Sequence, residues 1–276
     1  MRTGTIAVCI AVLVVAGLAG MARADWNAGD PAKWVQMPDL QTGLDVNATW
    51  KQDAAGGPQW PFVKTLADDF LCVQTGYVTD IHIWGSWLDD LINPNAVFNL
   101  SIHADIPAGA GGVNYSQPGQ LLWQQSFNPN QYKVQRWETA TEDFYDPNTG
   151  KMLGRDTIVW QYNFFIPAAK AFLQKGTKEE SKVYWLDVMA VLPPVPGPVV
   201  DPTVFGWKTS ITHWGDDAVF GDTQDPAIPP TVWKELRDPR DPLRSLDMAF
   251  VITPEPATMA LLGLGAMGLL ARRRRK

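Results

Sequence analysis

Hydrophobic and polar residues alternate along much of the chain, and this alternation predicts β-strands. The clearest case is residues 98–106, where every second residue is apolar and those between are polar. A period of two places one set of side chains in a core and the other on the opposite face. Weaker patterns, rich in β-branched and aromatic residues, occur at 78–84, 121–127, 158–166 and 182–192, with shorter ones at 67–73, 134–139, 205–210 and 246–252.

Residues that favour turns separate these segments, notably at 107–112, 128–130, 146–150 and 193–202. Long amphipathic helical patterns are absent between residues 25 and 253, where 168–174 could form only one or two helical turns. About ten short strands joined by Pro- and Gly-rich connections predict an all-β fold. We expect an antiparallel β-sandwich of the jelly-roll or immunoglobulin-like kind, flanked by a signal helix and a C-terminal hydrophobic helix.

Residues 1–24 have the three parts of a secretory signal peptide. Arg2 lies near the start, residues 5–20 are apolar, and Ala22 and Ala24 form a small-x-small cleavage site. An uncleaved membrane anchor is the alternative, but the apolar run is shorter than the roughly 20 residues of a spanning helix. We therefore expect export through the Sec translocon and cleavage before Asp25.

The C-terminus contains a second segment of three blocks. An extended, Pro-rich triplet precedes an apolar stretch at 257–271, and a cluster of cations ends the chain; the residues are Pro254, Glu255, Pro256, Arg272, Arg273, Arg274, Arg275 and Lys276. Fifteen helical residues reach only about 22 Å, against a hydrocarbon core of about 30 Å. The segment is therefore a poor permanent anchor, and its cations would remain on the cytoplasmic side.

These blocks resemble the PEP-CTERM sorting motif of Gram-negative bacteria. The resemblance covers residues 253–276 and implies recognition and cleavage by a membrane-embedded exosortase. It further implies a transient inner-membrane intermediate, followed by release to the cell surface or the extracellular matrix, where exopolysaccharide is an expected partner. An ordinary C-terminal tail anchor is the alternative, but an anchor does not require the Pro-Glu-Pro triplet.

Charge and cysteine content narrow the function classes. Residues 25–253 contain 16 Lys and Arg against 28 Asp and Glu, a formal charge of −12. This net negative charge argues against nucleic acid as a partner, because proteins bind nucleic acids through basic patches. Cys72 is the one cysteine outside the signal, so an internal disulfide is excluded, and its apolar neighbours predict a buried small side chain.

The exported part divides into an irregular, Trp-rich segment at 25–61, packed on a β-sandwich domain at 62–252. This body is similar to exported, uncharacterised PEP-CTERM proteins. The stretches that carry the resemblance are residues 33–38, 67–70, 83–87, 184–187, 206–208, 213–219 and 247–252. The resemblance implies no catalytic residues.

Histidines and clustered aspartates in the sequence are candidate ligands for two kinds of metal ion. His82 and His103 are expected on the solvent faces of their strands and His213 elsewhere, without the spacing of a zinc site. Asp216, Asp217, Asp222 and Asp225 lie within ten positions, and such carboxylates suit Ca²⁺, although they do not fit an EF-hand loop. A solvated acidic loop is the alternative, and we expect no other cofactor.

Thirteen tryptophans offer a further interpretation, because exposed indoles can stack against sugars. Trp84, Trp87, Trp207 and Trp214 are the candidates, with core packing as the alternative. No glycosidase pair, Ser/His/Asp set or nucleotide loop is recognisable. We therefore expect a non-enzymatic surface or matrix protein with a structural or adhesive role, the alternatives being a carbohydrate-binding module or a secreted glycan hydrolase or lyase.

Overall fold

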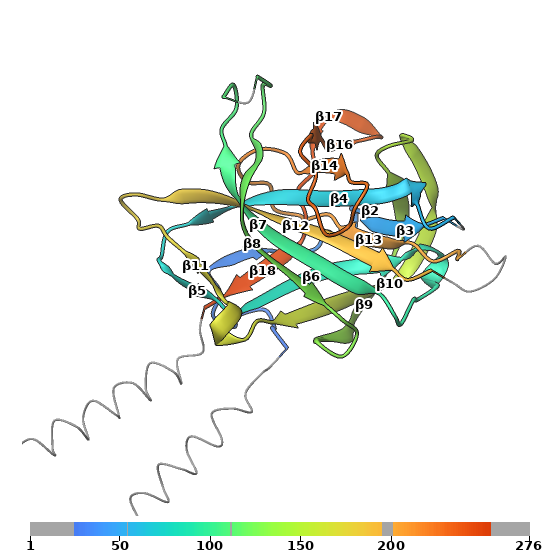
Figure 1. Cartoon of the computed structure of the whole chain (residues 1–276), viewed down its shortest axis with the longest axis horizontal. Helices are drawn as coiled ribbons and strands as arrows, with labels where there is room; N and C mark the ends of the chain where they lie inside the picture. The colour runs from blue at the N-terminus through green and yellow to red at the C-terminus, as the bar shows by residue number, and fades with distance from the viewer. Residues whose placement is uncertain (1–24, 54, 111, 195–200, 255–276) are drawn as a thin grey trace, which may run out of the picture.

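A computed structural model describes residues 25–53, 55–110, 112–194 and 201–254 (Figure 1). The signal peptide and the sorting segment from Glu255 onward lie outside these residues, as do their expected helices. The described residues contain no helix long and apolar enough to cross a membrane. The two short 3₁₀ turns are η1 (Leu88–Asp90) and η2 (Ala168–Lys170).

Strands account for most of the regular structure. They are β1 (Trp34–Gln36), β2 (Leu44–Asn47), β3 (Thr49–Gln52), β4 (Pro58–Cys72), β5 (Gly76–Val78), β6 (Asp80–Trp87), β7 (Val97–Ile106), β8 (Gln117–Phe127), β9 (Tyr132–Asp146), β10 (Lys151–Phe165), β11 (Phe172–Gln174), β12 (Lys182–Leu192), β13 (Phe205–Lys208), β14 (Val219–Asp222), β15 (Lys234–Glu235), β16 (Arg237–Asp238), β17 (Asp241–Ser245) and β18 (Phe250–Thr253).

The first of two seven-stranded sheets has the order β1-β18-β6-β10-β9-β2-β13. Its neighbours are antiparallel except β2 and β9, which run parallel. β13 also pairs with β6, beside the half of β6 that β18 leaves free. The strands β6, β10, β9, β2 and β13 therefore form a closed ring, which we call the strand ring.

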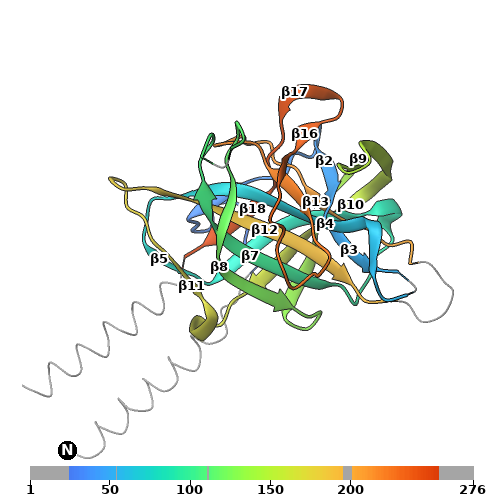
Figure 2. The ribbon, with the colours of Figure 1, turned by 45° about the horizontal axis from the view of Figure 1, so that its top comes forward.

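The second sheet has the order β15-β14-β4-β3-β12-β7-β8, with an additional pairing of β4 with β12. Only β3 and β12 are parallel in this sheet. Two small ribbons complete the fold, β5 with β11 and β16 with β17; the latter projects from the body in Figure 2. Residues 168–174, which could form one or two helical turns, contain the single 3₁₀ turn η2 followed by β11.

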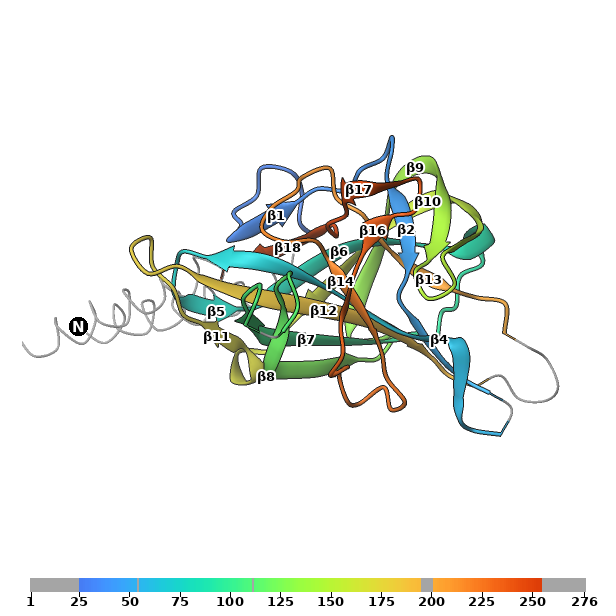
Figure 3. The same cartoon turned by 90° about the horizontal axis from the view of Figure 1, so that it is seen from above.

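The two large sheets pack face to face in layers (Figure 3) around one apolar core. The alternation that predicted strands fills this core: Phe98, Leu100 and Ile102 of β7 face residues such as Ile83 of β6, and all are fully buried. The all-β sandwich class is confirmed, with the two parallel pairings as exceptions to the antiparallel pattern.

The N-terminal segment is more regular than the sequence predicts. Residues 25–61 contain β1, β2, β3 and the start of β4, all of them members of the two sheets. β1, β2 and β3 are only three or four residues long, so a periodic pattern is hard to detect in them. The indoles do fix the segment: Trp26 and Trp50 are buried, and Trp34 packs on Phe70, whereas Trp60 is 60% exposed.

The outer face of the first sheet is covered, which corrects the prediction for two histidines. A second apolar cluster lies on that face, formed by Trp26, Trp84, Ala140, Val159, Ala249 and Val251. His82 is buried on this face and contacts Asn163. His103 lies on the second sheet and is also buried, between Asp187 and the Gly119 carbonyl. Alternation therefore gave the face of each histidine correctly but not its exposure.

Phe98 provides a test of the core, because its ring lies within 5.4 Å, centroid to centroid, of four other rings: those of Tyr132, Tyr162, Phe164 and Phe205. We expect Phe98→Ala to lower the free energy of unfolding by about 3–5 kcal/mol, since it leaves a cavity that rigid sheets cannot close. Urea unfolding measures the change. Leu122→Ala, at a 39% exposed position of neighbouring β8, should cost less than about 1 kcal/mol. Equal losses in both variants would contradict this core assignment.

Candidate functional site

Five aspartates from distant parts of the chain gather beside β4, and we call them the acidic cluster. They are Asp68 and Asp69 of β4, Asp105 of β7, Asp216 from the β13–β14 connection and Asp247 just before β18. Asp68, Asp69 and Asp247 are almost fully buried, whereas the other two are half-buried. Strand pairing explains part of this arrangement, because β12 lies between β4 and β7.

Backbone amides hold several of these carboxylates in place. The amide of Met248 donates to Asp68 Oδ2 over 2.7 Å, and the amide of Trp214 donates to Asp247 Oδ2 over 2.7 Å. The amide of Asp216 donates to Asp69 Oδ2 over 3.2 Å, while Asp69 Oδ1 is buried without a hydrogen-bond partner. An unpartnered buried carboxylate oxygen is unusual in a native protein and requires an explanation.

Gly215 brings the β13–β14 connection against Asp69. Its φ of +72° lies in the left-handed region, and a Cβ at this position would lie 2.5 Å from Asp69 Oδ2. Glycine therefore allows both the turn and the close approach. The same connection carries His213, whose Nδ1 lies 3.6 Å from Asp247 Oδ2 at the edge of the cluster.

The crowding of carboxylates shifts their pKa values upward. Burial raises the pKa of Asp69 to about 8, and the charges of Asp247, Asp105 and Asp216 add to the shift. Burial also raises the pKa of Asp247 to about 7 and that of Asp68 well above its usual range. Protonation of Asp69 and Asp247 therefore reduces the repulsion among these carboxyls.

The neighbouring acids Asp217 and Glu235 are already neutralised by an arginine. Ligand oxygens of Asp216, Asp217 and Glu235 all lie within 4.8 Å of one another. However, Arg237 Nη2 lies 2.7 Å from Asp217 Oδ2 and 2.9 Å from Glu235 Oε1. Because the guanidinium supplies the positive charge to this pair, we exclude Asp217 and Glu235 from the acidic cluster.

The structure brings together two of the four aspartates predicted for Ca²⁺, Asp216 and Asp217, whereas Asp222 and Asp225 have other partners. Asp222 is paired with Lys64 over 2.5 Å and accepts a hydrogen bond from Asn148. Asp225 is exposed and caps its own turn through Ala227. Of these four, Asp216 alone belongs to the acidic cluster. Its neighbours there are distant from it in sequence. In the sequence, the two adjacent aspartates Asp68 and Asp69 within an apolar strand were the feature that could have indicated the acidic cluster.

The sugar-stacking prediction is wrong for three of its four tryptophans. Trp84, Trp87 and Trp207 are at most 1% exposed, because each packs in an apolar cluster. Trp214 is half-buried, and its ring meets Trp34 edge to face at 5.0 Å. Cys72 is buried and free, which confirms its prediction as a small core side chain.

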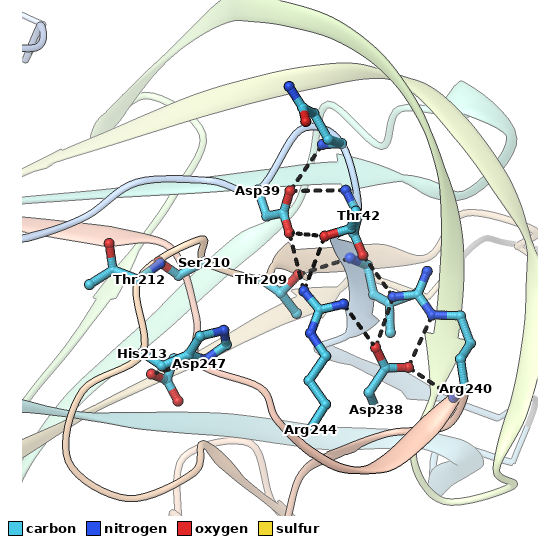
Figure 4. A network of polar contacts seen from close by, with 12 residues as sticks. Asp39, Thr42, Thr209, Ser210, Thr212, His213, Asp238, Arg240, Arg244 and Asp247 are labelled. Atoms are coloured by element: carbon cyan, nitrogen blue, oxygen red, sulfur yellow. Dashed lines mark hydrogen bonds and ion pairs between the residues drawn. The ribbon is translucent and has the colours of Figure 1, made fainter.

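A separate polar network binds the loop after β1 to the β16–β17 ribbon (Figure 4). Asp39 accepts hydrogen bonds from Thr42 and lies 3.4 Å from an Arg244 nitrogen. Arg244 and Arg240 both reach Asp238 of β16, and Arg240 also donates to the Thr42 carbonyl. Every charged group in this network is paired with one of opposite charge. The network therefore stabilises the contact between the loop and the ribbon.

Comparison with protein families identifies the chain. Residues 32–253 match the family described as Domain of unknown function (DUF7901), and the chain therefore belongs to this family. Residues 253–276 match the PEP-CTERM protein-sorting motif, as the sequence predicted. The motif marks a protein that is exported, processed by an exosortase-type membrane protease, and placed at the cell surface or in the extracellular space. No curated protein matches the chain.

The acidic cluster predicts a stability that depends on pH. Between the carboxyl pKa of an unfolded chain, about 3.9, and the raised pKa values of Asp69 and Asp247, the folded state binds more protons than the unfolded state. The free energy of unfolding should therefore fall as the pH rises from 5 to 8.

Urea unfolding across this pH range measures the effect. The double variant Asp69→Asn, Asp247→Asn should flatten the pH dependence, because amides keep the oxygen acceptors and lose the charge. Asp241→Asn, at an exposed position, is the matched control and should leave the dependence unchanged. A wild-type protein that gains stability from pH 5 to pH 8 would contradict the assignment.

Proposed function

We propose that this protein is a non-enzymatic structural or adhesive component of the cell surface or extracellular matrix, and that the sandwich itself is the delivered unit. One observation carries the proposal. β18 is an internal strand of the first sheet, paired with β1 and β6, and its last residue, Thr253, is also the first residue of the sorting motif. The motif therefore joins the core of the domain directly.

Both ends of the exported domain lie at one end of the sandwich. Thr79, next to the start of β6, donates a hydrogen bond to the Pro254 carbonyl. Asp25 accepts a hydrogen bond from Asn163 of β10, which contacts His82 of β6. A domain held by its C-terminus at the membrane would thus present its opposite end outward. Export through the Sec translocon and a transient inner-membrane intermediate precede release in this proposal.

A deletion strain tests both parts of the proposal. The full chain should be recovered outside the cell without residues 257–276, and it should restore the cohesion of cells that lack the gene. A chain ending at Pro254 should fold but remain in the cell envelope space, since the sandwich is complete without the motif. Mass spectrometry of fractions and a cell-aggregation assay provide the measurements. Recovery of the intact chain wholly in the inner membrane would contradict sorting, and unchanged cohesion would contradict the structural role.

Divalent-cation binding is a second candidate activity, which the acidic cluster favours. Asp69 has a buried oxygen without a hydrogen-bond partner, and the charges of Asp247, Asp105 and Asp216 repel its carboxylate. Ca²⁺ takes six to eight oxygen ligands with loose geometry, and a bound ion would offset this repulsion.

We expect Ca²⁺ to raise the melting temperature by roughly 5 °C at pH 8 and by much less at pH 5, where protons compete for the same oxygens. Differential scanning fluorimetry measures the shift. Asp69→Asn should abolish it, while Asp225→Asn, outside the acidic cluster, should preserve it. A shift lost in Asp225→Asn but kept in Asp69→Asn would place the ion elsewhere, and no shift at millimolar Ca²⁺ would end the proposal.

A further inference from the structure

A second group of charged side chains lies inside the strand ring, where each of the five strands contributes one residue. Lys208 of β13 pairs in register with Asp45 of β2, and Glu142 of β9 pairs in register with Asp156 of β10. Ser86 of β6 completes the group, which we call the ring cluster. All five residues are buried, none more than 5% exposed. Such burial is costly for charged groups that remain imperfectly paired.

The contacts within the ring cluster are not those of a satisfied ion-pair network. Lys208 Nζ lies 2.9 Å from Asp45 Oδ2 and is in direct contact with Glu142 Oε2. Even so, Glu142 Oε1 is buried without a hydrogen-bond partner, and the Asp156 carboxyl lies beside Ser86 and Asp45. Nearly all buried polar atoms in native proteins have partners. The Lys208 amine thus lies between two carboxylates, those of Asp45 and Glu142.

Asp156 supplies an acid beside this contact. Burial, followed by the nearby charge of Asp45, raises the pKa of Asp156 to about 10. The Asp156 carboxyl is therefore protonated at neutral pH and can both give and accept a proton. Because Asp156 is protonated, Asp45 has no second ionised carboxylate from Asp156 beside it.

We propose that Lys208 and Glu142 condense to form an intramolecular amide cross-link. A proton first passes from the Lys208 ammonium to the Glu142 carboxylate, which leaves a neutral amine and a carboxylic acid. The Nζ lone pair then attacks the Glu142 carboxyl carbon, the new N–C bond forms, and the C–OH bond breaks to release one water. Asp156 gives a proton to the departing oxygen and takes one from the nitrogen, so it ends as it began. The step needs no oxidant or other reactant, because an amine and a carboxylic acid yield an amide and water.

The surroundings favour the amide in two ways. The strand pairing holds the reacting groups in contact before reaction, which removes most of the entropic cost of bringing them together. The product replaces two buried charges with one neutral amide, and the closed interior limits the water needed for hydrolysis. Asp45 acts as a positioning residue, because its carboxylate binds Nζ from the neighbouring strand.

Such a bond would have a defined structural effect. β9 and β13 are not hydrogen-bonded to each other, since β2 lies between them. The cross-link would therefore span β2 and fix the strand ring in its closed form. The exported chain has Cys72 as its one cysteine, so no internal disulfide can do this.

Peptide mass spectrometry of the full chain recovered from cells tests the proposal. After reduction and trypsin digestion, we expect the peptide 137–151 joined to 183–234, with no cleavage at Lys208. The joined mass should be lower than the sum of the two peptides by about 18 Da, one water. Free peptides 137–151 and 183–208 as the main products would overturn the proposal, and linkage of Lys208 to peptide 34–51 would overturn Glu142 as the acceptor.

Variants separate the chemistry from folding. Lys64→Arg changes another buried lysine that is paired with a carboxylate, and it should leave the cross-link intact. Asp156→Asn should form the link roughly a hundredfold more slowly while circular dichroism still reports a native sandwich. Undiminished linkage in Asp156→Asn would overturn its proton-transfer role. Glu142→Gln should form the same link with loss of ammonia instead of water, and failure of this folded variant to link at all would count against the mechanism.

Discussion

The pairing of β13 with both β2 and β6 is the constraint on which much of this structure depends. It closes the strand ring, and closure converts what would be the outer face of a sheet into a second interior. Two glycines permit it: a Cβ at Gly85 would lie 2.6 Å from the Gly206 carbonyl oxygen, and one at Gly206 would lie 2.6 Å from the Phe144 ring. Side chains larger than hydrogen would force these strands apart.

Closure explains why groups expected on the surface are buried. His82 and Trp84 alternate with the core residues Ile81 and Ile83, so they belong to the opposite face of β6. That face is covered by the N-terminal segment and by the arm formed by β9 and β10, which places Trp26 and Trp137 against Trp84. Burial holds the pKa of His82 at about 4, so its imidazole stays neutral at physiological pH. The same closure places Lys208 among three carboxyls.

The sequence predicted what depends on local periodicity. β7 and β12 correspond closely to the segments expected at 98–106 and 182–192. Strict alternation and a high content of β-branched residues can be recognised within a single strand, without knowledge of its partners. β1, β2 and β3 were missed, since strands of three or four residues are stabilised by their partners rather than by their own composition.

The sites were harder to predict, because their members are brought together by pairings between distant segments. Asp69 and Asp247 are 178 positions apart yet share one cluster, and no spacing rule encodes such a meeting. Asp222 and Asp225 are near Asp216 in sequence. However, Asp222 forms an ion pair with a lysine, and Asp225 accepts a hydrogen bond within its own turn. The sorting motif was predictable because its recognition depends on contiguous blocks and not on folding.

Hydrogen–deuterium exchange at β13 tests the closure of the strand ring most directly. The backbone amides of residues 206–208 should exchange as slowly as those of central β6, since β13 lies between two hydrogen-bonded neighbours. Exchange at the rate of the exposed 211–213 loop would show that β13 does not close the ring, and the buried environment described for Lys208 would then be wrong.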